Sequence, residues 1–410
     1  MKDRRVLMFA YHFPPENSVG GARPFRFYKY LGRLGYKCRV ITAADVSSRP
    51  DLDAECIPDP FVGTEGQDLG FQVERAIRKA LLPGVTGVQW AMHAYESGLR
   101  FVKTHADDEV TIFSSFPPLG VHIAAHRLVR TTGLPWIADY RDPLGDNPIN
   151  DRLGRHTRLT YSWLERVFMD SAARTVANTD EAEAVLKRKF ASDDSKIHLI
   201  WNGFDPEERL SAAPVAEGSR KLLTHIGELY QGRTAAPILE SLERLFATGT
   251  VSSSCIQVCL VGGVEPTCLP PPEFVQRAET AGWLSVTPYA IPKCEAQGLA
   301  QRSEGLLLVQ PQSAIQVPGK LFEYLQIGRP ILAFVPRRSA IERLLSKTGV
   351  PFHCVYPDMG AEAFDETVLN FLSLRSDPVP PGAWFEESFN AVSQAEELAD
   401  LIEQCWRDRR

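Results

Sequence analysis

The sequence predicts an α/β protein that consists of two doubly wound domains, each a parallel sheet covered by helices, facing each other across a cleft. Short apolar runs of strand length alternate with helical patterns in both halves of the chain. A length of 410 residues suits two domains of roughly 200 residues each better than one. No repeat of about 20–50 residues and no heptad pattern is found in the sequence, which excludes solenoids and coiled coils.

The first half contains apolar runs that predict buried strands. These strands are expected to begin at residues 6, 38, 110, 134, 174 and 196. Helical patterns lie between them, at 24–34, 71–82, 88–104, 120–131, 156–172 and 180–190. Alternation of strand and helix predicts parallel pairing, so the carboxyl ends of the strands share one edge of the sheet.

Polar residues gather at two of these strand ends. Ser115 ends one apolar run, and Asp139, Arg141 and Asp142 end the next. Three charged groups within four positions are hard to explain by packing, and open α/β sheets bind ligands at this edge. We therefore expect a functional role for this group.

The second half restarts the alternation, with strands expected to begin at residues 221, 254, 284, 305 and 331 and a helix at 235–247. After the strand at 305–310, Pro318 and Gly319 stand where a loop turns into a helix that Gly328 ends. The free N–H groups and the dipole of a helix N-terminus favour an anion such as a diphosphate.

Three charged residues of the second half suit a nucleotide. Lys320 lies at the expected helix N-terminus, and the forked donors of Arg233 suit a diphosphate bidentately. Glu323, one turn into the helix, can accept from both hydroxyls of a ribose. The alternative is an ordinary helix on which Lys320 and Glu323 form a solvated pair.

The stretch 311–331 resembles the donor-binding segment of glycosyltransferase family 4, a retaining family with the GT-B fold. The resemblance implies that Glu323 binds the ribose of a nucleotide sugar and that Pro318 and Gly319 belong to the donor site. Many members carry a second Glu eight positions before the first, where this sequence has Ile315.

Arg233 resembles a phosphate-binding cation of the same family. The family commonly has a further Arg about five positions earlier, where Glu228 stands in this sequence. The resemblance therefore implies that Lys320 or Arg23 supplies the missing positive charge.

The opening of the chain resembles a subset of the family. Tyr-x-Phe-Pro-Pro is followed by Gly-Gly-Ala-Arg-Pro, which implies that Gly20 and Gly21 lie under the donor phosphates and that Arg23 is within reach of them. A basic cluster follows, made of Arg26, Lys29, Arg33, Lys37 and Arg39. It is either a solvated helix face or a contact with a phosphorylated lipid acceptor or an anionic membrane surface.

The pair Ser-Ser-x-Pro-Pro and Asp-x-Arg-Asp-Pro resembles the same subset, which implies an acceptor side made by Ser115, Asp139 and Arg141. Many members have a His where Ser115 stands. Asp142 or Asp139 is then the candidate for orienting the acceptor hydroxyl and taking its proton.

The resemblance also implies a domain plan of two Rossmann-like domains. We expect an acceptor-binding domain at 1–205, a linker at 206–218 and a nucleotide-sugar-binding domain at 219–385. The remaining segment, 386–410, has the pattern of one amphipathic helix, which in the GT-B fold crosses back to the first domain.

Several classes are disfavoured by composition. A net charge of −6 argues against a nucleic-acid binder. The pair His122 and His126 lacks an intervening Glu and a third ligand, so we expect ordinary helix residues and no metal. Scattered cysteines and the lack of any stretch near the ~18 apolar residues of a membrane span predict a cytoplasmic protein, with peripheral contact at the inner membrane.

The expected activity is retaining, metal-independent transfer of a hexosyl or N-acetylhexosaminyl group, without a cofactor, in cell-surface polysaccharide biosynthesis. The donor would be a UDP- or GDP-sugar and the acceptor a hydroxyl of a glycan or lipid-linked glycan. Arg233 and Lys320 would stabilise the leaving diphosphate, and Asp142 would serve the acceptor. The alternatives are a nucleotide-sugar epimerase and a non-catalytic GT-B partner subunit.

Overall fold

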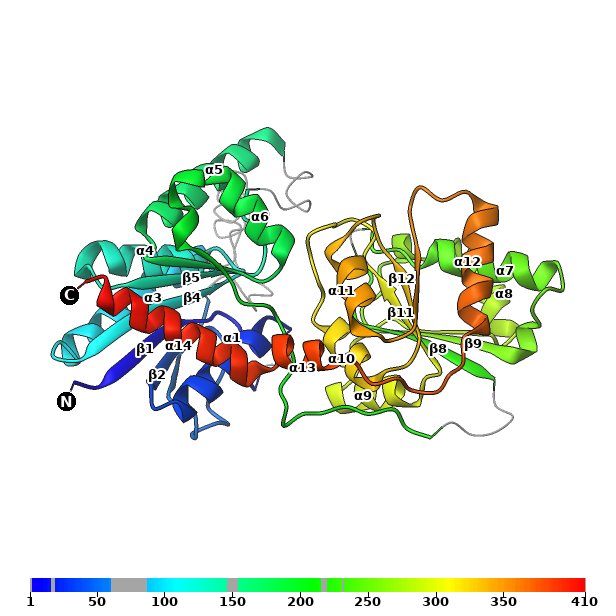
Figure 1. Ribbon diagram of the computed structural model, residues 1–410, viewed down its shortest axis with the longest axis horizontal. Helices are drawn as coiled ribbons and strands as arrows, with labels where there is room; N and C mark the ends of the chain where they lie inside the picture. Colours follow the sequence, from blue (N-terminus) through cyan, green and yellow to red (C-terminus); the bar gives the residue numbers. More distant parts are fainter. Residues whose placement is uncertain are drawn as a thin grey trace, which may run out of the picture. The chain divides into compact units, whose positions relative to one another are not determined.

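The structure, a computed structural model, describes residues 2–15, 19–59, 87–145, 154–214, 220–230 and 232–409. The chain forms two compact units (Figure 1). Unit 1 comprises Met1–Gly203 together with Ala391–Arg410, and unit 2 comprises Phe204–Asn390. The expected helix at 71–82 and part of the expected linker, 215–218, lie outside the described residues.

Unit 1 is built on a parallel sheet of seven strands in the order β3-β2-β1-β4-β5-β6-β7. The strands are β1 (Arg4–Phe9), β2 (Lys37–Thr42), β3 (Ala54–Cys56), β4 (Glu109–Phe116), β5 (Trp136–Tyr140), β6 (Arg174–Ala177) and β7 (Ile197–Leu199). The central strands β1, β4 and β5 are buried along almost their whole length, since helices cover both faces of the sheet. This double burial explains their continuous apolar runs.

Among its described residues, unit 1 has the helices α1 (Val19–Arg33), α3 (Val88–Thr104), α4 (Gly120–Thr132), α5 (Gly154–Ser171), α6 (Asp180–Lys189) and α14 (Ala391–Arg407). The last of these, α14, packs along α1, although the two helices are separated by most of the chain (Figure 1). Apolar residues of both helices share one core cluster, among them Phe27 and Leu31 of α1 and Leu398 and Ile402 of α14.

The expectation of a single helix at 386–410 is wrong. The structure has two helices here, α13 (Ala383–Phe389) and α14, separated by the extended residue Asn390. The reason lies in competing hydrogen bonds: the carbonyl of Phe389 accepts from the N–H of Phe204 at 2.9 Å, and Asn390 forms a β-bridge with Phe204. The bridge to Phe204 holds Asn390 in an extended conformation with ψ of 126°, and a residue in this conformation interrupts the helix.

Unit 2 is built on a parallel sheet of six strands in the order β10-β9-β8-β11-β12-β13. The strands are β8 (Lys221–Ile226), β9 (Ile256–Val261), β10 (Leu284–Thr287), β11 (Gly305–Val309), β12 (Ile331–Phe334) and β13 (Phe352–Val355). The helices besides α13 are α7 (Ala236–Ala247), α8 (Pro272–Thr280), α9 (Lys293–Arg302), α10 (Lys320–Ile327), α11 (Ala340–Thr348) and α12 (Ala361–Ser373). The predicted class, α/β with two doubly wound parallel sheets, is confirmed.

One helix begins earlier than the sequence predicts. The expected start was residue 24, but α1 already begins at Val19 and contains Pro24. Proline lacks the N–H that would donate to the carbonyl four residues before it, here that of Gly20. That carbonyl instead accepts from Nη1 of Arg141 at 2.8 Å, so the missing helical bond is replaced from outside the helix.

Two glycines at helix ends in unit 2 differ in how much space surrounds them. Comparing their alanine variants separates the cost of a left-handed backbone from the cost of a steric clash. Gly328 after α10 and Gly349 after α11 have similar φ values of 74° and 79°. An added Cβ would lie 2.5 Å from the carbonyl oxygen of Val379 at Gly328, whereas nothing lies within 4 Å at Gly349. We expect Gly349→Ala to lower the free energy of unfolding by about 1–2 kcal/mol, the cost of the left-handed backbone.

The variant Gly328→Ala should lose about 1–3 kcal/mol more than Gly349→Ala, because its Cβ forces the backbone at Val379 to move. Urea denaturation of both variants measures the difference. Equal losses of unfolding free energy in the two variants would show that the backbone at Val379 moves away from the added Cβ without loss of stability.

Candidate functional site

The first candidate group lies in unit 2, where the carboxyl end of β8 meets the start of α10. Nζ of Lys320 donates to the carbonyl of Ile226 at 2.7 Å and lies 3.0 Å from Nε2 of His225. Gly227 follows with φ of 108°, and an added Cβ there would lie 3.0 Å from the same ammonium. The positive φ therefore favours glycine here, and a larger residue would also press against the ammonium of Lys320.

The hydrogen bonds of His225 fix which ring nitrogen carries the proton. Nδ1 lies 2.9 Å from the carbonyl of Leu307, which can only accept, so Nδ1–H is the donor. Nε2 is then free to accept from the ammonium of Lys320. Burial, followed by the charge of Lys320, lowers the pKa of His225 well below its usual value and keeps the ring neutral.

Lys320 is itself electrostatically unusual. Burial, and next the charge of Arg233, lower its pKa to about 7, while the charges of Glu228 and Glu323 oppose the shift. Arg233 is half-buried, and its guanidinium lies 4.6 Å from the ring centroid of Tyr230. Two cations from different segments thus influence each other at the end of β8, an arrangement suited to a group with more than one negative charge.

Glu323 lies in the first turn of α10 and is half-buried. Its Oε1 accepts from Nε2 of Gln297 on α9 at 3.2 Å. The next residue, Tyr324, ties the helix to β8, because its hydroxyl accepts from the N–H of Ile226 at 3.0 Å. The ammonium of Lys320 is directed at the strand end, so the alternative of a solvated Lys320–Glu323 pair does not describe this helix.

The structure thus brings Lys320, Arg233 and Glu323 into one electrostatic group, as the sequence analysis expected, with Pro318 and Gly319 directly before α10. The N–H groups of Leu321 and Phe322 donate to the carbonyls of Pro318 and Gly319, which forms a tight first turn. The contact of Pro318 and Gly319 with a nucleotide-sugar donor stays a prediction. The sequence analysis missed His225, although a histidine inside an apolar strand was a visible signal.

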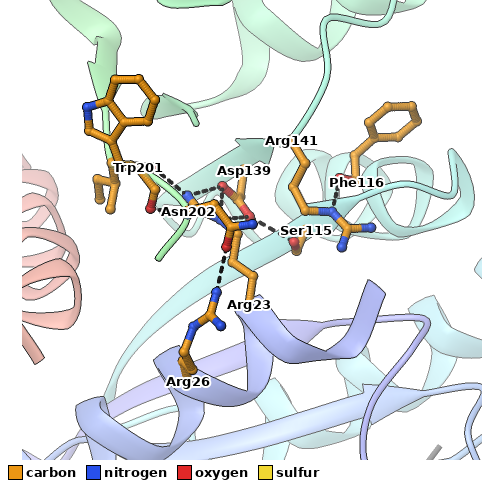
Figure 2. A network of polar contacts seen from close by, with 9 residues as sticks. Arg23, Arg26, Ser115, Phe116, Asp139, Arg141, Trp201 and Asn202 are labelled. Atoms are coloured by element: carbon orange, nitrogen blue, oxygen red, sulfur yellow. Dashed lines mark hydrogen bonds and ion pairs between the residues drawn. The ribbon is translucent and has the colours of Figure 1, made fainter. Parts of the chain in front are cut away.

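The second candidate group lies in unit 1 and is centred on a buried ion pair between Arg23 of α1 and Asp139 of β5 (Figure 2). The side chains are 3% and 0% exposed, and Nη2 lies 2.8 Å from Oδ1. The same guanidinium donates to the carbonyls of Ile200 at 2.9 Å and Trp201 at 2.6 Å. Ser115 of β4 donates its hydroxyl to Oδ2 of Asp139 at 2.7 Å.

These contacts point to structural roles for three residues that the sequence analysis placed in ligand contact. Arg23 was expected near donor phosphates, but its three guanidinium nitrogens all donate within unit 1. Ser115 and Asp139 were expected on the acceptor side, but both are buried and bonded to each other. The predicted ligand contacts of these three residues stay predictions.

Arg141, which directly follows β5, also connects the end of β5 to the start of α1 (Figure 2). Its Nε donates to the carbonyl of Phe116, the last residue of β4, at 2.8 Å, and its Nη2 donates to that of Pro117, the next residue, at 3.2 Å. Its Nη1 reaches the Gly20 carbonyl at the start of α1. Burial lowers the pKa of Arg141, whereas the charges of Asp139 and Asp142 raise it.

Asp142 is the residue predicted to take the acceptor proton, and this role stays a prediction. It lies just beyond β5, is half-exposed, and is close enough to Arg141 to influence its charge. A partly exposed carboxylate beside a fixed guanidinium is a reasonable acceptor for a hydroxyl proton.

Gly20 and Gly21 lie in the first turn of α1, tightly against the loop after β1. An added Cβ would lie 2.7 Å from the ring of His12 at Gly20 and 3.2 Å from Cα of Phe13 at Gly21. Close packing of the helix against its own chain therefore accounts for both glycines. Their expected place under donor phosphates is not tested by these contacts.

The histidines of α4 form no metal site with other described residues. Ser114 Oγ accepts from Nε1 of Trp136 and is hydrogen-bonded to Nδ1 of His122, both at 2.8 Å. Burial lowers the pKa of His122 to about 3. His122 is accordingly a neutral core residue.

Residues 24–208 match the family model described as Glycosyltransferase Family 4. No curated protein matches the sequence. Among solved structures, HepE of Anabaena in complex with UDP and glucose is 12% identical with a TM-score of 0.59, over 98% of this chain and 100% of that chain. The lipopolysaccharide outer core galactosyltransferase WaaB is also 12% identical, with a TM-score of 0.59, over 98% and 99%.

A third similar structure is the UDP-GlcNAc 2-epimerase of Neisseria meningitidis bound to UDP-GlcNAc. It is 10% identical with a TM-score of 0.56, over 98% of this chain and 100% of that chain. Identities this low show the fold alone, which is that of the GT-B glycosyltransferases. Together with the family match, they confirm the predicted resemblance.

The buried pair in unit 1 gives a prediction for stability. We expect Asp139→Asn to lower the free energy of unfolding by about 3–5 kcal/mol, because the charge of Arg23 stays buried without its counter-charge. The matched control is Asp51→Asn, which removes a pair whose carboxylate is 58% exposed and should cost far less, because water and salt screen an exposed pair. Urea denaturation measures both.

The double variant Arg23→Met/Asp139→Asn should lose less than the sum of the two single variants, since no unpaired charge remains. Additive losses, or a loss for Asp139→Asn no larger than that of the exposed control, would contradict this account of the pair.

Proposed function

Because this chain has the fold of the GT-B glycosyltransferases and its first unit carries the family match, we propose that it is a retaining glycosyltransferase. It transfers a hexosyl or N-acetylhexosaminyl group from a UDP- or GDP-sugar to a hydroxyl of a glycan or lipid-linked glycan, in cell-surface polysaccharide biosynthesis. The observation that carries the proposal is the group of Lys320, Arg233 and Glu323 at the end of β8 and the start of α10.

The chemistry divides among these residues. The bond between the anomeric carbon and the diphosphate breaks, and the diphosphate leaves with the bonding electrons. Lys320 and Arg233 stabilise that developing charge, so the proposed reaction needs no metal ion. Glu323 accepts from the ribose hydroxyls and holds the nucleoside against α10. The acceptor oxygen then bonds to the anomeric carbon on the face that the diphosphate left, and Asp142 takes the hydroxyl proton.

Support for a nucleotide-sugar donor comes from the similar structures. HepE is known in complex with UDP and glucose, and the Neisseria epimerase in complex with UDP-GlcNAc. The second of these also supports a second candidate, a nucleotide-sugar epimerase. That reaction needs paired carboxylates and a histidine, and in unit 2 the buried His225 already uses both ring nitrogens.

The donor site is tested by thermal unfolding against a panel of nucleoside diphosphates and nucleotide sugars. A ligand at ~100 times its dissociation constant should add about 2.7 kcal/mol to the stability of the wild type. Glu323→Ala, Arg233→Ala and Lys320→Ala should lose most of this gain, because each removes a ligand contact. Matched controls are Glu273→Ala on α8 and Arg302→Ala on α9, both exposed and in the same unit.

Stabilisation that survives in all three site variants would place the nucleotide elsewhere. Binding without transfer to any acceptor would favour the non-catalytic partner subunit, and conversion of UDP-GlcNAc to an epimer would favour the epimerase. Where transfer is found, NMR of the new linkage distinguishes retention from inversion at the anomeric carbon.

Donor binding should also depend on pH. The pKa of Lys320 is about 7 before binding, and a bound diphosphate must raise it by favouring the ammonium. Above that pH, binding therefore takes up as much as one proton, and apparent affinity should fall by up to about tenfold per pH unit. A nucleotide sugar is the proper probe, since its esterified phosphates do not titrate in this range.

Titration calorimetry in two buffers of different protonation enthalpy measures the proton uptake directly. Lys320→Arg is the control, because arginine stays charged and should give a flat profile. A flat profile with no proton uptake in the wild type would show that Lys320 already carries its full charge.

A further inference from the structure

The outer face of α5 in unit 1 exposes two large apolar side chains. Leu159 is 60% exposed and Trp163 is 62% exposed, and the two are four residues apart, so they lie on one face of the helix. Burying large apolar groups normally stabilises a protein, which makes an exposed pair of this kind informative.

Arginines flank this apolar pair along the same face. Arg155 lies four residues before Leu159, and Arg166 lies three residues after Trp163; both are exposed. Over 155–171, the exposed acidic residue is Asp170, because Glu165 is buried. The face therefore combines an apolar centre with a positive charge at each end.

The exposure of this face does not come from a loosely attached helix. On the opposite side of α5, Phe168 and Met169 belong to the main core of unit 1. The buried carboxylate of Glu165 accepts from Nζ of Lys189 at 2.6 Å and from the N–H of Leu144 at 2.7 Å. These contacts fix the rotation of α5, so Leu159 and Trp163 must point outward.

The basic cluster that the sequence analysis associated with a membrane has a different character. Lys37 forms an ion pair with Asp3, and Arg39 forms ion pairs with Asp53 and Glu55. Lys29 and Arg33 lie against the ring of Tyr30 of the same helix, at 4.9 and 5.0 Å from its centroid. Nearby acidic residues neutralise part of that cluster. Among the described residues, no pair of exposed large apolar side chains lies within it.

We propose that α5 binds the surface of a bilayer that contains anionic phospholipid, with Leu159 and Trp163 inserted at the headgroup boundary and Arg155 and Arg166 on lipid phosphates. Tryptophan favours the membrane interface, and arginine keeps its charge among headgroups while its stem lies on apolar surface. This inference is independent of the proposed transferase activity, because none of its residues belongs to either candidate group. No described helix of the chain is long and apolar enough to cross a membrane, so α5 would lie on the bilayer.

Charge favours a bilayer over a second copy of the chain as the partner of this face. In a two-fold symmetric dimer the face meets itself. Each copy would bring two exposed arginines of this face, Arg155 and Arg166, against one exposed acid, Asp170, so the two faces carry the same net charge and repel each other. An anionic lipid surface complements the same charges.

Vesicle co-sedimentation tests the proposal, with phosphatidylcholine alone and with about one third phosphatidylglycerol. The wild type should bind the anionic vesicles. Leu159→Ala/Trp163→Ala should weaken binding by at least about tenfold through lost apolar contact. Arg155→Gln/Arg166→Gln should weaken it by about thirtyfold on anionic vesicles, and the loss should shrink with added salt.

Two control variants separate this face from general charge and exposure. Lys29→Gln/Arg33→Gln removes the same charge from α1, and Tyr289→Ala removes a 66% exposed aromatic ring from unit 2. Both should bind as the wild type does. Quenching of tryptophan fluorescence by brominated lipid should be reduced in Trp163→Phe, which keeps an apolar ring and so guards against a folding defect.

Failure of the wild type to bind anionic vesicles would overturn the proposal, as would unchanged binding by the Leu159→Ala/Trp163→Ala variant. A dimer in sedimentation velocity that is lost in that variant would also overturn it and assign the face to a second copy. Equal losses in the α1 control would move the membrane surface to the basic cluster.

Discussion

The buried ion pair between Arg23 and Asp139 is the contact on which the geometry of unit 1 depends. It joins the start of α1 to the end of β5, and Arg141 joins the same elements in the reverse direction through the Gly20 carbonyl. An arginine after β5 thereby replaces the helical hydrogen bond that Pro24 cannot make. The two first-half motifs resembling the family are therefore parts of one structure, because each supplies an arginine to the other.

The corresponding constraint in unit 2 is the neutral state of His225. If its ring were protonated, Nε2 would donate, and two cations would then meet at 3.0 Å within the sheet end. Burial, and next the charge of Lys320, keep the ring neutral, and the carbonyl of Leu307 places its single proton on Nδ1. Lys320 is thus placed by an acceptor on the central strand β8 and does not depend on a flexible surface partner.

The central strands could be located from the sequence. Helices cover them on both faces of the sheet, so each of these strands is a continuous apolar run. The sequence was insufficient for the edge strands β3 and β13, which are short and only partly buried, so that their residues carry no such run. The positions of Lys320, Arg233 and Glu323 followed from motif spacing. The sequence did not show that the side chain of Arg23 points into unit 1, because its partner Asp139 lies 116 positions away and only folding brings the two together.

The charge pattern at the end of β8 explains how the site tolerates a glutamate where the family commonly has an arginine. Glu228 alone would weaken an anion site, but its charge also favours the ammonium of Lys320 against the repulsion of Arg233. Two permanent cations beside each other would cost stability in every state of the protein. A lysine with a pKa of about 7 avoids part of that cost and gains full charge when an anion approaches. In the proposed transfer, its positive charge is therefore greatest when the diphosphate leaves.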